Sequence, residues 1–368
     1  MRSMRTAAKI PIAHPIIGDQ ERQRVLEVLA SGMLVAGKMV QEFEEAFAAY
    51  IGVPHAVATS SGTTALQAAL EALGIGAGDR VVTTPFTFAA TSHAIVHAGA
   101  RPVFADVDPA TGNLDSAAVE AVVRQEGAKA VIAVHLYGLP CDMHALGDVA
   151  RRHGLLLIED CAQAHGAAFR GRKAGSFGDA AIFSFYPTKN MTTGEGGMIL
   201  TGDPEVARRA RLLVDPRAEE EYVYSVIGYN FRMTDVAAAM GLPQLDRLEE
   251  LNGARRRNAR TLTAGLRGLP WLSPPVEPEG AKHVYTAYTV RARAREALMT
   301  HLTREGIGHK IFYPMLIPHT PAYRRLGFDG SFPAAEALTR EVLALPVHPA
   351  LSGEDLQRII EVVTAFRP

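Results

Sequence analysis

Cysteine is scarce in this chain: only Cys141 and Cys161 occur in 368 residues. Two thiols are too few for a disulfide framework or for a thiolate metal site, because both need several cysteines. No group of His, Asp and Glu residues shows the spacing of metal ligands either. We therefore predict no metal centre, and we expect the reducing environment of the cytoplasm.

A strong net charge and a long apolar run are also absent. The formal net charge is -1, which gives no electrostatic reason to bind nucleic acid or an anionic membrane. No apolar stretch approaches the roughly 20 residues that span a bilayer. The basic segment 1–15 has no long apolar core before Pro11, so it does not match a signal peptide. We expect neither nucleic acid nor a membrane as a partner.

The composition that is present fits a globular enzyme with two domains. The chain is 48% hydrophobic and 21% charged, and 368 residues are too many for one ordinary domain. A long helical pattern covers residues 234–266, and prolines then cluster between residues 270 and 278. We predict a large domain with an N-terminal arm over residues 1–245 and a smaller C-terminal domain over residues 246–368.

The apolar pattern of the first domain alternates between strands and helices. Residues 19–51 carry a helical pattern, which Gly32 and Gly37 divide into two helices. Strand-like runs follow at residues 80–84, 102–106, 130–135, 155–159, 180–185 and 197–201. This alternation predicts an α/β fold whose mostly parallel sheet is sandwiched by helices. The smaller domain should be α+β, with strands at 284–290 and 309–313 and helices at 295–305 and 354–366.

One lysine, Lys189, lies between an apolar strand and the glycine-rich start of the next strand in the segment 183–197. Burial disfavours the charged form of a lysine, so its free amine becomes available as a nucleophile toward a carbonyl group. The alternative is a loop lysine whose amine reaches water. The segment alone favours neither interpretation.

Other polar groups are expected at the same edge of the sheet. The run 155–160 ends a strand with Glu159 and Asp160, whose side chains should point to opposite faces. The turn 61–63 precedes a helix whose N-terminal amides suit a phosphate. Each feature alone is weak, because an acid can simply cap a helix. Together with Ser184 and Lys189 they provide what pyridoxal phosphate requires: an amine, an acid for its ring nitrogen and donors for its phosphate.

These motifs resemble those of the DegT/DnrJ/EryC1/StrS family of sugar aminotransferases, which are fold-type-I pyridoxal phosphate enzymes. The resemblance covers nearly the whole chain, through SSGTTAL, TPFTFAAT, ARPVFADVDP, EDCAQAHGA, FSFYPTKNMTTGEGG and GYNFRM. It implies that Lys189 bonds to the cofactor and that Asp160 pairs with the ring nitrogen, both as catalytic residues. The other cofactor contacts that it implies are Gln163 with the ring hydroxyl, Phe88 stacked on the ring, and Gly62, Thr63 and Ser184 with the phosphate.

The resemblance also assigns residues farther along the chain. Asn230 matches a position that reaches the phosphate of the neighbouring subunit, which implies a homodimer with shared active sites; the alternative is a residue that satisfies its own turn. Arg232 is either a ligand for the donor carboxylate or part of an interface salt bridge. Tyr313 is expected to contact substrate. Phe312 stands where the family often has histidine, so His309 or His319 is a candidate to replace that hydrogen bond.

The expected reaction moves an amino group from an amino acid, with L-glutamate as the expected donor, to a nucleotide-linked keto-sugar. Such a reaction belongs to amino-sugar, polysaccharide or antibiotic-sugar biosynthesis. One alternative is an aminotransferase that acts on a cyclitol ketone. Another is a regulatory protein that binds pyridoxal phosphate without turnover, which the presence of Lys189, Asp160, Gln163 and Ser184 disfavours. The motifs do not identify the nucleotide, the sugar or the carbon that is aminated.

Overall fold

A seven-stranded sheet forms the centre of the first region in this computed structural model, which describes residues 9–217 and 224–368. Most of the basic start of the chain, residues 1–8, lies outside the described residues. The strand order is β1-β9-β8-β5-β4-β2-β3. Strand β9 is antiparallel to both of its neighbours and the remaining pairs are parallel, so the mostly parallel sheet is confirmed. The strands are β1 (His55–Thr59), β2 (Arg80–Thr83), β3 (Arg101–Phe104), β4 (Ala130–Val134), β5 (Leu156–Asp160), β8 (Ala180–Ser184) and β9 (Gly197–Thr201).

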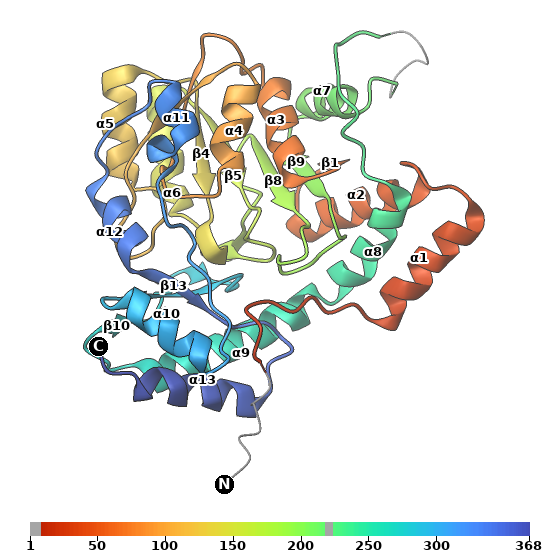
Figure 1. Ribbon diagram of the computed structural model, residues 1–368. Coiled ribbons are helices and arrows are strands. Elements are labelled where there is room, and N and C mark those ends of the chain that lie inside the picture. Colours follow the sequence, from red (N-terminus) through yellow and green to blue (C-terminus); the bar gives the residue numbers. More distant parts are fainter. Residues whose placement is uncertain (1–8, 218–223) are drawn as a thin grey trace.

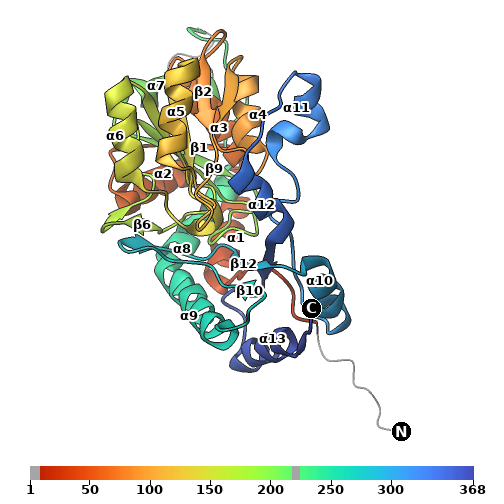
Figure 2. The same cartoon turned by 90° about the vertical axis from the view of Figure 1, so that its left-hand side faces the viewer.

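Helices cover both faces of this sheet. Because successive strand residues point to opposite faces, Ile182 packs with one layer of helices and Phe183 with the other. The first layer contains α3 (Gly62–Ala72), α4 (Ala90–His97) and α7 (Pro204–Val214); the second contains α2 (Lys38–Ile51), α5 (Ser116–Glu126) and α6 (Met143–His153). Figure 2 shows α4 and α6 on opposite sides of the strands. Among the helices of the two described ranges, none combines the length and the apolar character needed to cross a bilayer.

The long helical pattern of residues 234–266 forms two helices. Helix α8 (Asp235–Asp246) is capped by Thr234, whose hydroxyl accepts the Ala237 amide at 3.2 Å. Arg247 separates it from α9 (Leu248–Leu266) with φ -98° and ψ 0°. The helical pattern is thus interrupted at this one residue, because an apolar pattern can continue across a one-residue break. Helix α8 packs on α1 (Asp19–Ser31) and α2, while α9 packs on the C-terminal helix. The domain boundary at residues 245 and 246 remains a prediction.

The C-terminal region has its own antiparallel sheet and core. Its sheet has the order β10-β12-β13, with β10 (Leu272–Ser273), β12 (Tyr288–Ala292) and β13 (Val342–Leu345). Helices α9, α10 (Arg295–Arg304) and α13 (Gly353–Ala365) enclose a core that includes Leu262, Tyr288 and Ile359. Figure 1 shows this region below the large sheet.

Two predicted strands of the second region differ from the structure. The first begins at Tyr288, because residues before it turn away: Tyr285 has φ 47°, and Val284 and Thr286 donate their amides to carbonyls of Gly138 and Tyr137. The second, at residues 309–313, is reduced to an isolated bridge between Lys310 and Ala344. The first segment therefore joins the two regions, whereas the second makes one bridge to β13 within its own region.

Short elements complete the connection between the regions. Strand β11 (Ala281–Lys282) pairs with β6 (Ala168–Phe169), which pairs with β7 (Arg172–Lys173). The first turn of helix α12 (Pro333–Glu341) is bound by Asp106, whose carboxylate accepts the Ala334 and Ala335 amides at 3.0 Å. The remaining elements are η1 (Leu136–Gly138), η2 (Ile317–His319) and α11 (Pro321–Arg325). Periodicity does not predict elements of two to five residues.

Candidate active site

Asp160 is the last residue of β5, at the carboxyl edge of the parallel strands. Its side chain is buried, with the Thr91 hydroxyl donating to Oδ2 at 2.8 Å and the Ala162 amide donating to Oδ1 at 3.1 Å. Burial raises the pKa of Asp160, although these hydrogen bonds and the nearby Lys189 amine act in the opposite direction. The edge therefore holds a buried carboxylate whose negative charge is incompletely compensated.

Glu159 points to the other face of the sheet, as predicted from the strand period. Its carboxylate accepts hydrogen bonds from the amides of Gly175 (2.8 Å), Phe177 (2.6 Å) and Gly178 (3.0 Å), and it lies 3.0 Å from His135 Nε2. Glu159 thus holds the loop that precedes β8 against β5. Of the two adjacent acids, only Asp160 is directed toward Thr91 and Lys189.

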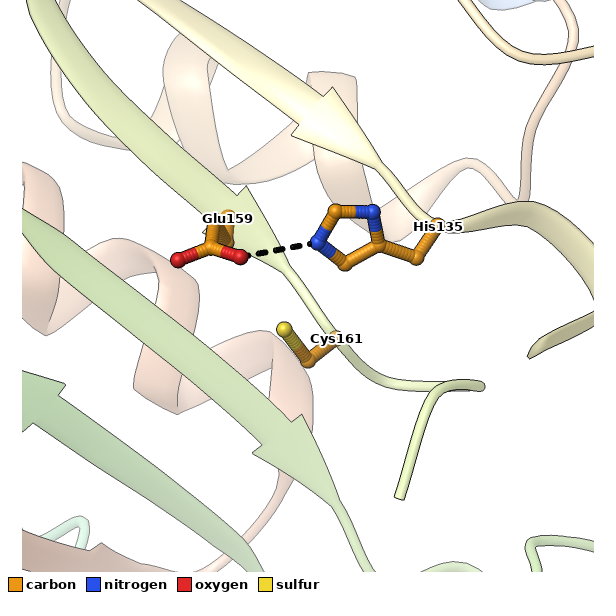
Figure 3. Close-up of side chains that lie close together, drawn as sticks. All are labelled: His135, Glu159 and Cys161. Atoms are coloured by element: carbon orange, nitrogen blue, oxygen red, sulfur yellow. Dashed lines mark hydrogen bonds and ion pairs between the residues drawn. The ribbon is translucent and has the colours of Figure 1, made fainter. Parts of the chain in front are cut away.

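Figure 3 shows Glu159 and His135 joined by a hydrogen bond, with Cys161 beside them. These three side chains have their potential ligand atoms within 4.8 Å of one another. However, the Cys141 amide donates to His135 Nδ1 at 3.0 Å, so the imidazole proton lies on Nε2 and points at Glu159. Burial raises the pKa of Cys161 to about 12, so its thiol stays protonated. The donor atoms are engaged within the protein, and we propose no metal here.

Lys189 lies in the connection between β8 and β9, where its amide donates to the Tyr186 carbonyl at 2.9 Å. Desolvation lowers the pKa of the Lys189 amine to about 8, although the charge of Asp160 acts in the opposite direction. Within the described residues, the amine makes no hydrogen bond. A large share of this amine is therefore neutral at slightly alkaline pH, which favours the nucleophile over the solvated loop lysine.

Gln163 and Tyr313 meet across the two regions of the chain. The Tyr137 amide donates to Gln163 Oε1 at 2.6 Å, which directs Nε2 toward the Tyr313 hydroxyl at 3.1 Å. The ring of Phe88, which is 61% exposed, has its centroid 6.4 Å from that of Tyr313. The Tyr313 hydroxyl is also close enough to Asp160 for the carboxylate to help raise its pKa, after the larger effect of burial. Asp160, Lys189, Gln163, Tyr313 and Phe88 thus form one site.

The start of helix α3 lies against the end of β8. Ser61 caps the helix by accepting the Thr64 amide at 3.2 Å, which leaves the first amides of the helix, at Gly62 and Thr63, without intrahelical acceptors. A Cβ atom at Gly62 would lie 2.7 Å from Ser184 Cβ. Only glycine permits this approach, which sets the free amides beside the Ser184 hydroxyl. This arrangement suits a phosphate group.

The other predicted residues lie outside this cluster in the single chain. Asn230 is exposed and has no side-chain hydrogen bond within residues 9–217 and 224–368, although its neighbour Phe231 accepts the Ser60 amide at 2.6 Å. Arg232 forms an ion pair with Asp215 at 3.1 Å. His309 Nδ1 lies 3.0 Å from the Ile307 carbonyl. Their assignments to the neighbouring subunit and to substrate remain predictions.

Sequence reasoning missed two residues that hold this site in place. Thr91 fixes Asp160, and the sequence offers only its four-residue spacing from Thr87, which precedes α4 and whose hydroxyl lies 3.3 Å from that of Thr91. Tyr137 holds Gln163 through its backbone amide and its hydroxyl donates to the Phe312 carbonyl. Its φ of 59° is unusual for a residue with a side chain. Nothing local in the sequence indicates that conformation.

Replacing Thr91 with valine should lower kcat by about ten- to a hundredfold, because a hydrogen bond to a charged group contributes about 1.5–3 kcal/mol. The carboxylate of Asp160 would lose its fixed orientation while the site keeps its volume. Steady-state kinetics with saturating substrates measure the change. Thr83→Val is the matched control, because among residues 9–217 and 224–368 this buried hydroxyl bonds only to the Ile132 carbonyl within the sheet. Equal losses of kcat in both variants would contradict the role of Thr91.

Comparison with known proteins gives a consistent result. The profile of the DegT/DnrJ/EryC1/StrS aminotransferase family matches residues 15–364. GDP-perosamine synthase of Caulobacter vibrioides is 42% identical over 365 residues, covering 96% of both chains. A pleiotropic regulatory protein of Geobacillus stearothermophilus is 41% identical over 354 residues, covering 94% of both chains. The crystal structure of DesV from S. venezuelae superposes with a TM-score of 0.90 at 39% identity, covering 94% of this chain and 93% of DesV.

Proposed function

The chain belongs to the DegT/DnrJ/EryC1/StrS aminotransferase family, and on that basis we propose that it transfers an amino group from L-glutamate to a nucleotide-linked keto-sugar with pyridoxal 5'-phosphate. Relatives named as a GDP-perosamine synthase and as a dTDP-amino-sugar transaminase support the class of acceptor. The observation that carries the proposal is the Lys189 amine, with its lowered pKa, beside the buried carboxylate of Asp160.

The residues at this edge fit the cofactor of the family. Asp160 is buried and incompletely compensated, and a protonated ring nitrogen would supply the missing positive partner. The close approach of Gly62 to Ser184 leaves helix amides and a hydroxyl for the phosphate. The Lys189 amine has no competing hydrogen bond within the described residues. Phe88 offers an exposed aromatic face for the ring.

Bound pyridoxal phosphate supplies an aldehyde carbon that bonds to amines and a pyridinium ring that takes up electrons from the substrate carbon. In this assignment Asp160 holds the proton on the ring nitrogen, and Thr91 holds Asp160. Lys189, once free, takes the proton from the α-carbon of the amino acid and later returns a proton to the substrate. An amine with a pKa of about 8 is suited to both steps, because it populates both protonation states near neutral pH.

The proposal is tested in two steps with the purified holoenzyme. L-glutamate should bleach the visible absorbance of the lysine-bound cofactor and release one equivalent of 2-oxoglutarate per chain. The protein that now carries the amino group is then mixed with 3-keto and 4-keto sugars linked to GDP, dTDP or UDP, and separately with a cyclitol ketone. New amines are identified by mass spectrometry. Amination of the cyclitol alone would select that alternative acceptor.

If the protein binds the cofactor but no amino acid bleaches its visible absorbance, the assignment as an aminotransferase is contradicted. That outcome is the one expected of a regulatory protein, and one relative is named a pleiotropic regulatory protein. The lowered pKa of Lys189 beside the buried carboxylate of Asp160 favours turnover.

An exposed apolar surface supports the assignment of a homodimer. It lies on α1 and the loop that follows, and comprises Leu26 (63% exposed), Leu29 (51%), Met33 (67%), Leu34 (44%) and Val35 (64%). The loop continues to Gly37, whose amide donates to Asp235 at the start of α8, close in sequence to Asn230. Figure 1 shows α1 standing out from the body of the molecule. Grouped exposed apolar side chains are typical of protein interfaces, and a second copy here would fit the proposed role of Asn230.

Mixing two inactive chains tests the shared site. Lys189→Ala and Asn230→Ala homodimers should each be impaired, whereas subunit exchange should restore roughly one quarter of wild-type activity, because half of the chains form mixed dimers with one intact site. Native mass spectrometry verifies the exchange. Complete exchange without any recovery would contradict a site that is shared between subunits.

A further inference from the structure

Asn190, the residue directly after Lys189, is bound entirely by the second region of the chain. Its side chain is 3% exposed. Nδ2 donates to Asn252 Oδ1 at 2.7 Å and to the Val284 carbonyl at 3.0 Å, and Oδ1 accepts from the Thr286 hydroxyl at 2.8 Å. The single proton of that hydroxyl is shared with the Gln163 carbonyl at 2.5 Å, so Thr286 also contacts Gln163 directly. Both ends of the Asn190 amide are thus hydrogen-bonded, so its orientation is fixed.

The partners of Asn190 are in turn hydrogen-bonded to residues that follow the carboxyl ends of the parallel strands. Asn252 donates to the His165 carbonyl at 2.8 Å, and the Thr286 amide donates to the Tyr137 carbonyl at 2.9 Å. Tyr137 is the residue whose own amide fixes Gln163. We call Asn190, Asn252 and Thr286 the amide clamp. It connects the residue beside Lys189 with the residues that orient Gln163.

The clamp bears on Lys189 because a lysine side chain has four flexible carbons and is positioned mainly by its backbone. The loop from Pro187 onward has no regular secondary structure up to β9. Loosening the clamp would leave buried polar groups unpaired, at a cost of about 1–3 kcal/mol for each group. The clamp therefore opposes any shift of the backbone that carries Lys189 into solvent.

We propose that Asn190 is a positioning residue, which keeps Lys189 directed into the site through its hydrogen bonds to Asn252 and Thr286. The inference rests on the proposed function, because it assigns to the clamp the position of the amine that the function needs. It also makes the reactivity of Lys189 depend on the contact between the two regions of the chain.

A matched control separates positioning from general stability. Asn258 lies on α9 as Asn252 does, is 8% exposed, and donates to the carbonyls of His348 (3.0 Å) and Val347 (3.4 Å). It makes no hydrogen bond to the loop of Lys189. Asn258→Ala should lower the melting temperature about as much as Asn190→Ala does, while leaving Lys189 in place.

The experiment measures the reactivity of Lys189 in the full-length chain without cofactor. Short pulses of acetic anhydride across pH are followed by peptide mass spectrometry, with an exposed lysine, Lys38, as internal standard. The midpoint for wild-type Lys189 is expected near pH 8. In Asn190→Ala and Thr286→Val it should rise by about one unit or more toward the ordinary lysine value of about 10.4. Thr286→Ser keeps the hydroxyl and should restore the wild-type midpoint.

An unchanged midpoint in both Asn190→Ala and Thr286→Val would overturn the clamp, as would an equal shift in Asn258→Ala. If Asn190→Ala fails to fold, the Thr286→Val and Thr286→Ser pair decides. A wild-type holoenzyme that transfers no amino group would end the proposed function while leaving the labelling result intact, so the two failures are distinguishable.

Discussion

Replacing Lys189 with alanine is expected to lower kcat by about a thousandfold or more, since proton transfer by a positioned side chain alone contributes about 10²–10⁴-fold. The variant also loses the amine that bonds to the cofactor, so its visible absorbance should match that of free pyridoxal phosphate. Stopped-flow measurement of the glutamate step and steady-state turnover check both effects. Retained turnover would contradict the assignment.

Two controls define the origin of this loss. Lys189→Arg keeps a positive charge but not a titratable amine, because a guanidinium stays protonated, so it should not restore activity. Lys129→Ala removes a lysine that binds the Gly74 carbonyl (2.6 Å) and Asp79 (2.8 Å) outside the site, and it should keep wild-type kcat. A comparable loss in Lys129→Ala would point to damaged folding.

The same lysine should also lower the stability of the cofactor-free chain. Its folded-state pKa of about 8 lies below the ordinary value of about 10.4, so the unfolded chain binds more protons between these values. Stability therefore increases as pH rises through this window. Lys189→Met should raise the free energy of unfolding at pH 7, and the gain should shrink above pH 8. Urea denaturation of both chains at pH 7 and above pH 8 measures the difference in unfolding free energy.

Asp160→Asn is expected to lower kcat by about a hundredfold or more, the scale of loss when one preorganised electrostatic partner is removed. The amide keeps the volume of the carboxylate and still accepts the Thr91 hydrogen bond, but it carries no negative charge to hold a proton on the ring nitrogen. Transient kinetics of the glutamate step measure the loss. A variant with wild-type rates would remove Asp160 from the catalytic assignment.

Without cofactor, the same substitution should stabilise the chain. Burial raises the pKa of Asp160, because the buried site favours the neutral carboxyl group. As pH rises through the folded-state pKa, this group ionises and the stability of the folded chain falls. Asp160→Asn removes this loss. The variant should exceed the wild type in unfolding free energy at neutral pH and match it in strong acid, below the ordinary aspartate pKa of about 3.9. An identical pH profile for both chains would contradict this account.

The sequence predicts the parts of the fold that depend on local pattern. The strand ending at Asp160, the helix start at Gly62 and the break between α1 and α2 at Gly32 and Gly37 all follow from periodicity and turn chemistry. The break at Arg247 was missed because the apolar pattern continues across it. The pairing of β11 with β6 was missed because two-residue strands are stabilised by the contact between regions and carry no pattern of their own.

The candidate site shows the same division. Lys189, Asp160, Gln163 and Ser184 belong to motifs within one short stretch of chain, and the resemblance assigns them directly. Thr91 and Thr286 act through partners 69 and 96 residues away, and no local signal marks such pairs. Asn230, Arg232 and His309 are assigned to a second subunit or to substrate, whose contacts a single chain does not contain.

The two adjacent acids of β5 have a consequence for the register of this strand. Glu159 pairs with Ala133 and Ala181, and Asp160 with Val134 and Ile182, on the two neighbouring strands. Since the side-chain period of a strand is two, a slip by one residue would exchange the faces of all its side chains. A slip of β5 by one residue toward its carboxyl end would bring Glu159 to the position of Asp160 and Ile158 to the position of Glu159. The amides of Gly175, Phe177 and Gly178 would then lose the carboxylate that accepts them.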